Sequence, residues 1–81
     1  MQISIEFLGN QRIITKADSI DMPITEKMTV SDALEYVRQM YPALPLDEGL
    51  ILITVNKRIA SLDRILNTHD TISFLPPISG G

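Results

Sequence analysis

The sequence ends in two glycines, Gly80 and Gly81, and the carboxylate of Gly81 is the group on which we base our functional interpretation. Glycine has no Cβ, so two in succession form a thread of bare backbone that passes through a narrow channel in another protein. The sequence contains no cysteine and a single histidine, His69, and so offers neither a thiol nucleophile nor a pair of histidines for a metal. We therefore expect no catalytic side chain, bound cofactor or metal in this chain, and expect Gly81 to react inside a partner's active site.

The residues just before the diglycine predict a projecting arm. Pro76 and Pro77 each fix φ at about −65° and lack an N–H, so they end a sheet ladder and hold the chain extended. From Pro76 to Gly81 the extended chain spans roughly 20 Å, long enough to enter a partner's active site. We therefore divide the chain into a folded domain, residues 1–75, and a flexible extended tail, residues 76–81. The alternative is an ordinary disordered end rich in small residues.

Length and charge exclude several classes of function. A chain of 81 residues forms one small domain, which is too short to enclose a deep substrate pocket. The net charge is −3, and the seven Lys and Arg residues are dispersed, which argues against a nucleic-acid partner. The sequence shows neither a secretory signal nor an apolar run of transmembrane length. We expect a cytoplasmic protein without a membrane partner.

The first third of the chain predicts two strands. Polar and apolar residues alternate over residues 2–8, as in a half-buried strand. Its inner face would carry Ile3, Ile5 and Phe7. Residues 9–10 indicate a turn, and the stretches 12–15 and 20–24 then read as extended chain. We expect one return strand in this region.

Thr29 and Asp32 predict the start of a helix. Their spacing fits a capping box, in which each side chain accepts a hydrogen bond from the other residue's backbone N–H. Apolar residues then recur at helical spacing, and Pro42 discourages continuation. The apolar face consists of Val30, Ala33, Leu34, Val37 and Tyr41. We expect this face to pack on a sheet, because an isolated helix of this length is unstable without burial.

The second half of the chain predicts further strands. The nearly unbroken apolar run 50–55 suits a central, well-buried strand beneath the helix, and a turn at 56–58 leads to a short strand at 59–60. Alternation resumes over residues 71–75. There we expect Ile72 and Phe74 to point inward.

Leu75 would then lie on the opposite face, exposed beside the tail. The elements together describe an α+β domain with a mixed sheet of four to five strands packed against one main helix. This is the β-grasp, or ubiquitin-like, arrangement. The fold alone does not assign a function.

The sequence resembles that of the MoaD family, the small sulfur-carrying subunits of molybdopterin synthase. The resemblance extends over the whole chain and is most specific in the ending Phe74-Leu75-Pro76-Pro77-Ile78-Ser79-Gly80-Gly81. The other matching positions are Val55, Asn56, Ser61, Asp63, Leu66 and Asp70. The related ThiS carriers share the fold and the diglycine but usually lack the Pro-Pro step. MoaD sequences often carry a short helix after the first strand, whereas residues 11–15 here look extended.

The resemblance implies a two-stage use of the Gly81 carboxylate. An E1-type adenylyltransferase similar to MoeB or ThiF would adenylate Gly81 with ATP, and a sulfur donor protein would convert it to a thiocarboxylate. Its sulfur would then attack a pterin precursor inside a MoaE-like large subunit. In this scheme Pro76 and Pro77 direct the tail, and Ile78 makes an apolar contact in the partner's channel. Ser79 and Gly80 complete the thin segment that leads to Gly81.

The resemblance also places Ile59 and Leu75 at the interface with the large subunit and the activating enzyme. The alternative for Ile59 is that it completes the core. The basic residues Arg12, Lys57, Arg58 and Arg64 are expected to be solvated surface charges rather than partner contacts. His69 occupies a turn position where the family commonly has glycine, so we expect a positive φ there.

Other functions remain open at the level of sequence. A ubiquitin-like protein modifier would use the same activated Gly81 but transfer it to a lysine amine. A sulfur carrier for thiazole or cysteine biosynthesis would differ in its partner. A plain interaction module would keep its function without Gly81.

Overall fold

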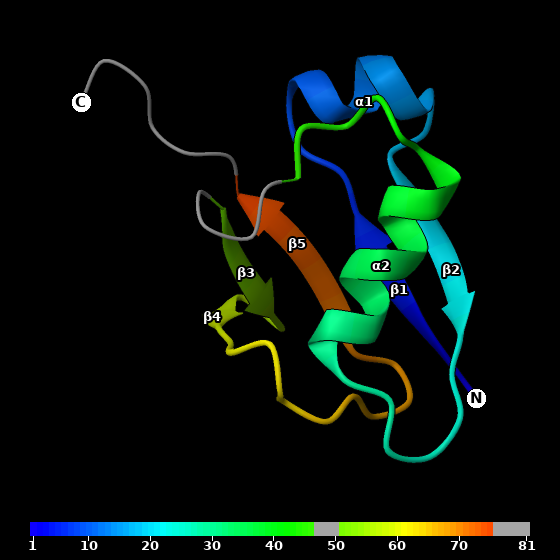
Figure 1. Cartoon of the computed structure of the whole chain (residues 1–81), viewed down its shortest axis with the longest axis vertical. Coiled ribbons are helices and arrows are strands. Elements are labelled where there is room, and N and C mark those ends of the chain that lie inside the picture. The colour runs from blue at the N-terminus through cyan, green and yellow to red at the C-terminus, as the bar shows by residue number, and fades with distance from the viewer. Residues whose placement is uncertain (47–50, 76–81) are drawn as a thin grey trace.

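The computed structural model describes residues 1–46 and 51–75, so the predicted tail, residues 76–81, and residues 47–50 lie outside the described part of the chain. The described residues form five strands and two helices (Figure 1). The strands are β1 (Gln2–Glu6), β2 (Ser19–Pro23), β3 (Leu52–Val55), β4 (Arg58–Ile59) and β5 (Thr71–Leu75). The helices are α1 (Asn10–Thr15) and α2 (Val30–Met40). This is the predicted β-grasp fold.

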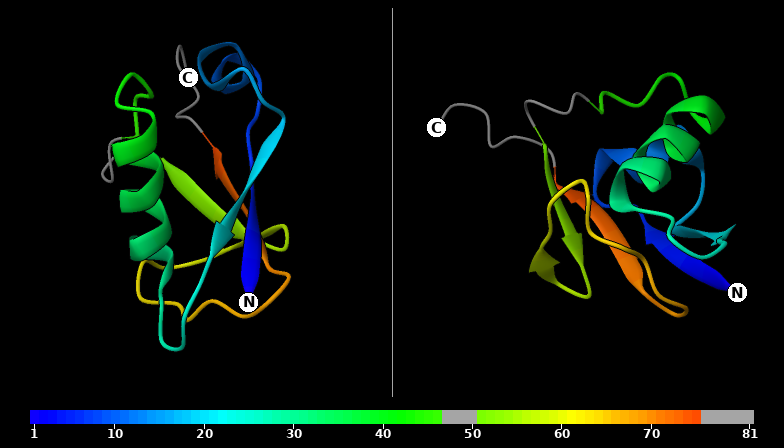
Figure 2. Two further views of the ribbon diagram at one scale, coloured as in Figure 1. Left: turned by 90° about the vertical axis from the view of Figure 1, so that its right-hand side faces the viewer. Right: turned by 60° about the horizontal axis from the view of Figure 1, so that its bottom comes forward.

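The five strands form one mixed sheet in the order β2-β1-β5-β3-β4. Strand β1 is parallel to β5 and antiparallel to β2, while β3 is antiparallel to both β5 and β4. Helix α2 lies across one face, and no described helix covers the other face (Figure 2). We call the uncovered face the outer face. One face of the sheet therefore belongs to the core, and the other is open to contacts.

Helix α2 forms as predicted. The Thr29 N–H donates to the Asp32 carboxylate (N–Oδ2 2.8 Å), and the Asp32 N–H donates to the Thr29 hydroxyl (N–Oγ1 3.4 Å), which is the capping box. Four of the predicted inner residues, Val30, Ala33, Leu34 and Val37, are buried. Tyr41 follows the helix and meets Phe7 edge to face, with ring centroids 5.6 Å apart.

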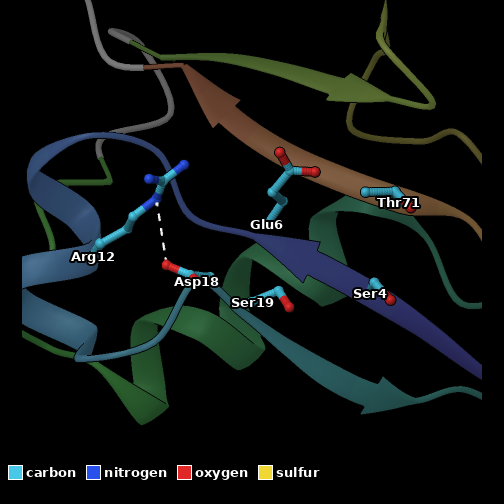
Figure 3. Close-up of a pocket in the computed structure, with 6 residues that line it drawn as sticks. All are labelled: Ser4, Glu6, Arg12, Asp18, Ser19 and Thr71. Carbon is cyan, nitrogen blue, oxygen red and sulfur yellow. Dashed lines mark ion pairs between the residues drawn. The ribbon is translucent and has the colours of Figure 1, made fainter.

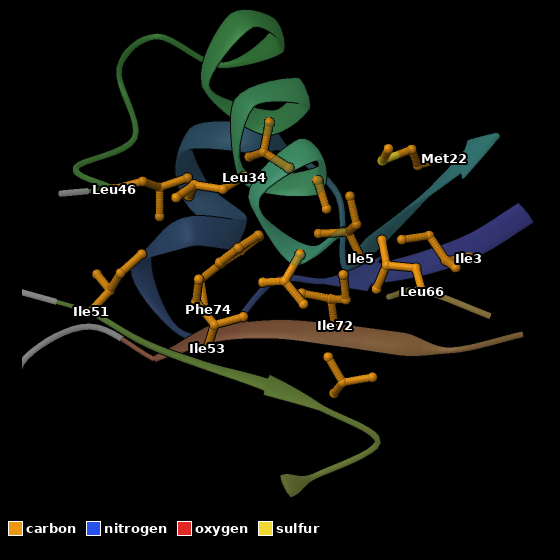
Figure 4. Packing of buried hydrophobic residues seen from close by; sticks show 14 of the residues in the cluster. Ile3, Ile5, Met22, Leu34, Leu46, Ile51, Ile53, Leu66, Ile72 and Phe74 are labelled. Atoms are coloured by element: carbon orange, nitrogen blue, oxygen red, sulfur yellow. The ribbon is translucent and has the colours of Figure 1, made fainter. Parts of the chain in front are cut away.

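The core lies between α2 and the inner face of the sheet (Figure 4). Strand β5 is its centre, because Ile72 and Phe74 are completely buried, as predicted. The prediction of a central, well-buried strand at 50–55 is wrong in three respects, namely its first residue, its place in the sheet and its burial. The strand begins at Leu52 and lies one place from the sheet edge, and Leu52 is exposed. An apolar run suggested burial on both faces, but α2 covers only one.

Residues 12–15 form part of helix α1 rather than the expected extended chain, so this prediction is wrong. The β-branched residues Ile13 and Ile14 suggested a strand, yet both are exposed. Gln11 and Thr15, four residues apart on one helical face, are the buried ones. Lys16 ends the helix in the left-handed region, at φ 60°, and its N–H donates to the Arg12 carbonyl. Tertiary contacts here override local propensity.

Three short features complete the fold. The β3–β4 turn places Asn56 at φ 53° and Lys57 at φ 70°, as two-residue hairpins with a type I′ turn require. His69 has φ 73°, which confirms the predicted positive φ. Neither described helix has the length and apolar character needed to span a membrane.

Candidate functional site

Three large apolar side chains gather on the outer face of the sheet. Leu52 pairs directly with Leu75 across β3 and β5, and Ile59 pairs with Thr54 across β4 and β3. Residues paired across strands share a face, and positions two apart on one strand share it too. Leu52, Ile59 and Leu75 therefore form one surface, which we call the outer patch.

The outer patch is accessible in the free chain. Ile59 is 73% exposed and Leu52 is 53% exposed. The alternative in which Ile59 completes the core is therefore wrong. Leu75 is half-buried rather than fully exposed, because Leu52 lies directly opposite and covers part of it. Exposed apolar side chains are informative when they form a patch, as these do.

The outer patch adjoins the point where the tail begins. Leu75 is both a member of the patch and the last described residue of β5. The predicted site residues of the tail, namely Pro76, Pro77, Ile78, Ser79, Gly80 and Gly81, lie outside the described residues. The structure thus brings Ile59 and Leu75 onto one face at the root of the tail. The outer patch therefore includes Leu75, the residue from which the tail continues.

Sequence reasoning missed Leu52. Residues 50–55 are nearly all apolar, so the sequence does not show which of them face outward. In the structure Ile51, Ile53 and Val55 are buried, whereas Leu52 faces outward. The signal that could have found it is the two-residue period counted back from Thr54 to Leu52. This period puts Leu52 on the face of Leu75 once the strands are paired.

A separate polar hollow of about 440 Å³ lies beside β1 (Figure 3). It is lined by Ser4, Glu6, Arg12, Asp18, Ser19 and Thr71. The Arg12 Nε lies 3.8 Å from the Asp18 carboxylate and donates to the Phe7 carbonyl at 3.0 Å. Within residues 1–46 and 51–75, no group of three His, Asp or Glu side chains is placed to hold a metal ion.

A buried carboxylate, Asp70, fixes the hairpin that carries Ile59. It accepts hydrogen bonds from the Asn67 N–H (2.8 Å), the Asn56 Nδ2 (2.8 Å) and the Arg64 guanidinium (3.1 Å). Asn56 also accepts from the Thr71 N–H at 3.0 Å. The β3–β4 turn is thereby tied to the start of β5. Arg64, expected as a solvated charge, is instead an internal partner of Asp70.

The same contacts set the pKa of Asp70. Burial raises the pKa of this carboxyl, but three hydrogen bonds and the charge of Arg64 together outweigh burial. The hydrogen bonds come from the Asn67 backbone and from the side chains of Asn56 and Arg64. The pKa of Asp70 in the folded chain is consequently lower than the ordinary value of 3.8. Asp70 is a structural residue that holds one side of the outer patch in place.

Comparison with known proteins gives full-length matches. The ThiS family model matches residues 5–81. The molybdopterin synthase sulfur carrier subunit of Escherichia coli (strain K12) is 30% identical, over 98% of this chain and 99% of that one.

Two solved structures are similar at 26% identity. The small archaeal modifier protein 1 from Methanosarcina acetivorans has a TM-score of 0.80 and covers 99% of this chain and 96% of its own. A chain from the complex of subunits 1 and 2 of molybdopterin-converting factor from Helicobacter pylori 26695 has a TM-score of 0.66, with both chains fully covered. Because the family match spans residues 5–81 and agrees with the fold, this chain belongs to the ThiS/MoaD family of sulfur carriers.

Proposed function

We propose that this chain is the sulfur carrier subunit of a molybdopterin synthase. The observation that carries the proposal is the exposed outer patch at the root of a tail whose sequence ends in Gly-Gly. The full-length similarity to the Escherichia coli carrier subunit supports the same assignment. In this role the chain is not an enzyme by itself. ATP is held by the activating partner, and this chain binds no cofactor.

The proposed chemistry takes place at Gly81. A carboxylate oxygen of Gly81 attacks the α-phosphorus of ATP, the bond to pyrophosphate breaks, and an acyl-adenylate forms. A hydrosulfide equivalent from a sulfur donor protein then attacks the acyl carbon, the bond to AMP breaks and a proton is released. The product is a C-terminal thiocarboxylate. Cationic groups that stabilise the phosphate charge belong to the MoeB- or ThiF-like adenylyltransferase.

The second stage uses the thiocarboxylate inside a MoaE-like large subunit. Its sulfur adds to an electrophilic, doubly bonded carbon of a pterin precursor. The π bond of that carbon opens, its electron pair takes up a proton, and the pterin is joined to Gly81 through a thioester. Water then hydrolyses the thioester, which leaves the sulfur on the pterin and restores the carboxylate. In the proposed complex Pro76 and Pro77 direct the tail, and Ile78 contacts the walls of the partner's channel. Ser79 and Gly80 pass through its narrowest part.

The outer patch is the proposed docking surface for both partners. Ile59 and Leu75 would lie in the contact, and we add Leu52 because it is exposed beside Leu75. Since both partners need the same face and the same tail, they would bind one after the other. Activation of Gly81 to the thiocarboxylate, which we call charging, would then take place in the complex with the activating enzyme. Delivery of the sulfur would take place in a separate complex with the large subunit.

The test is to incubate the chain with its activating enzyme, ATP and a sulfide source and to measure the intact mass. The mass should first show that the chain ends at Gly81 and then increase by one oxygen-to-sulfur exchange at that residue. The matched control lacks Gly81 and should not be charged. Its thermal unfolding should be unchanged, because the described core lies between Ile3 and Phe74. An uncharged wild-type chain under conditions that charge a known carrier would refute the proposal.

A protein modifier is the second candidate function. It is favoured by the similarity to the Methanosarcina acetivorans modifier, whose TM-score of 0.80 exceeds the 0.66 of the Helicobacter pylori chain at equal identity. Both functions begin with the same acyl-adenylate and differ in whether sulfur or a lysine amine attacks it. Proteolysed cell extracts distinguish them, because a modifier leaves Gly81-derived remnants on lysines of other proteins.

A further inference from the structure

The side chain of Gln11 makes a buried connection between α1 and the end of β5. Gln11 is 7% exposed, and both the nitrogen and the oxygen of its side-chain amide form hydrogen bonds. Nε2 donates to the Phe74 carbonyl at 2.8 Å, and Oε1 accepts from the Leu8 N–H at 2.9 Å. Phe74 is 63 positions from Gln11 in the sequence and immediately precedes Leu75, the root of the tail.

The position of this amide follows from where the β1–β5 ladder stops. The parallel pairing of β1 with β5 ends at Glu6 and Ser73. In the antiparallel β3–β5 pair, the Asn56 N–H donates to the Thr71 carbonyl, and hydrogen-bonded positions alternate from there. The Phe74 carbonyl therefore points away from β3, toward the side of β1, where the strand no longer supplies a partner.

Gln11 supplies the missing partner. Its side-chain amide lies between the Leu8 N–H and the Phe74 carbonyl, where the next peptide group of the ladder would otherwise be required. A buried carbonyl without a hydrogen-bond donor destabilises the fold, so the hydrogen bond from Gln11 stabilises it. The bridge also fixes the orientation of the Phe74–Leu75 peptide, from which the tail begins.

We propose that Gln11 is a positioning residue for the tail. By holding the Phe74 carbonyl it sets the direction in which the chain leaves the sheet, and so favours capture of the tail by the activating enzyme. This inference rests on the proposed carrier function and concerns a residue that does not itself touch the reacting atoms. Loss of the bridge should weaken capture while leaving the chemical step intact once the tail is bound.

Two variants of Gln11 distinguish the contributions of the two hydrogen bonds of its side-chain amide. Gln11→Glu keeps an acceptor for the Leu8 N–H but removes the donor to Phe74, and Gln11→Met removes both hydrogen bonds. The matched control is Thr15→Val on the same helix. Thr15 is 8% exposed, and among residues 1–46 and 51–75 its hydroxyl forms hydrogen bonds only with the Gln11 carbonyl and the backbone of Ala17. The control therefore weakens α1 without touching β5.

The assay measures KM and kcat of the wild-type chain and the variants as substrates of the activating enzyme with ATP. Both Gln11 variants should raise KM for the carrier about tenfold, the equivalent of about one hydrogen bond of a buried group, and change kcat less than about twofold. Thr15→Val should leave both constants unchanged. Equal KM values for the wild-type chain, Gln11→Glu and Thr15→Val would overturn the role of Gln11. Failure of the wild-type chain to be charged would instead refute the carrier function.

A measurement on the wild-type chain covers the case in which the Gln11 variants do not fold. The side-chain amide protons of Gln11 should exchange slowly with solvent, and NMR should detect a scalar coupling from Nε2 to the Phe74 carbonyl carbon. Fast exchange and the absence of the coupling would overturn the bridge, and with it the proposed positioning role.

Discussion

Truncation of Ile59 to alanine should separate binding from folding. The side chain is 73% exposed in the free chain, so its removal takes little apolar area from the core. A partner that covers the outer patch would bury this area, and the variant would lose that gain. The chain offers a matched control in Ile13 on α1, which is 72% exposed and outside the patch.

The expected magnitude follows from the exposed fraction. Complete burial of an isoleucine side chain is worth about 1.5–3 kcal/mol, and 73% of the residue is still available to a partner. Ile59→Ala should therefore weaken binding by about 1–2 kcal/mol, or raise Kd about 5- to 30-fold. The free energy of unfolding should change by no more than about 0.5 kcal/mol, as is usual for surface substitutions.

Two measurements on each variant test this reasoning. Calorimetric titration with the MoaE-like large subunit gives Kd, and urea unfolding gives stability. Ile13→Ala should match the wild-type chain in both. The reasoning is refuted if the two alanine variants weaken binding equally, or if Ile59→Ala unfolds the chain while its Kd stays unchanged.

Three further predictions concern stability. Because the pKa of Asp70 is lowered in the folded chain, its carboxylate contributes fully to stability at pH values above the ordinary pKa of 3.8. This contribution is lost as the pH falls below 3.8 and through the lower pKa of the folded state. Urea midpoints measured between about pH 6 and pH 2 should therefore fall less steeply in Asp70→Asn than in the wild-type chain; parallel curves would contradict the network. Lys57→Gly should raise the free energy of unfolding by about 0.5–1 kcal/mol, because glycine adopts φ 70° without a Cβ clash, and a decrease in urea unfolding would count against this. Thr29→Ala should lower it by about 1 kcal/mol through loss of the helix cap, and an unchanged urea midpoint would show that the cap is dispensable.

The sequence predicted the elements whose signals are local. The capping box and apolar stripe of α2 lie within one continuous segment, and the alternation of β5 places Ile72 and Phe74 inside without reference to other strands. These patterns depend on helical and strand periods alone. The positive φ at His69 was instead predicted from the resemblance, since the family commonly has glycine at this turn position.

The features that the sequence did not reveal depend on distant contacts. Helix α1 contains two β-branched residues and forms because Gln11 and Thr15 are buried on one of its faces. Helix α2 covers only one face of the sheet, and the sequence of residues 50–55 does not show which face that is. Leu52 therefore could not be assigned to the surface from these residues alone. The bridge from Gln11 to Phe74 spans 63 positions and needs the strand order first.

The outer patch offers a way to separate the carrier and modifier functions that the tail does not. Both functions start with adenylation of Gly81, so a chain without Gly81 should lose either one and cannot discriminate between them. Transfer of sulfur to a pterin needs a lasting complex with a large subunit, whereas transfer to a lysine amine needs only release of the activated tail to another protein. Variants of Ile59 or Leu52 should therefore reduce molybdopterin formation more than they reduce charging if this chain is a carrier. If charging and lysine conjugation persist while no large subunit binds the patch, the modifier function is the correct one.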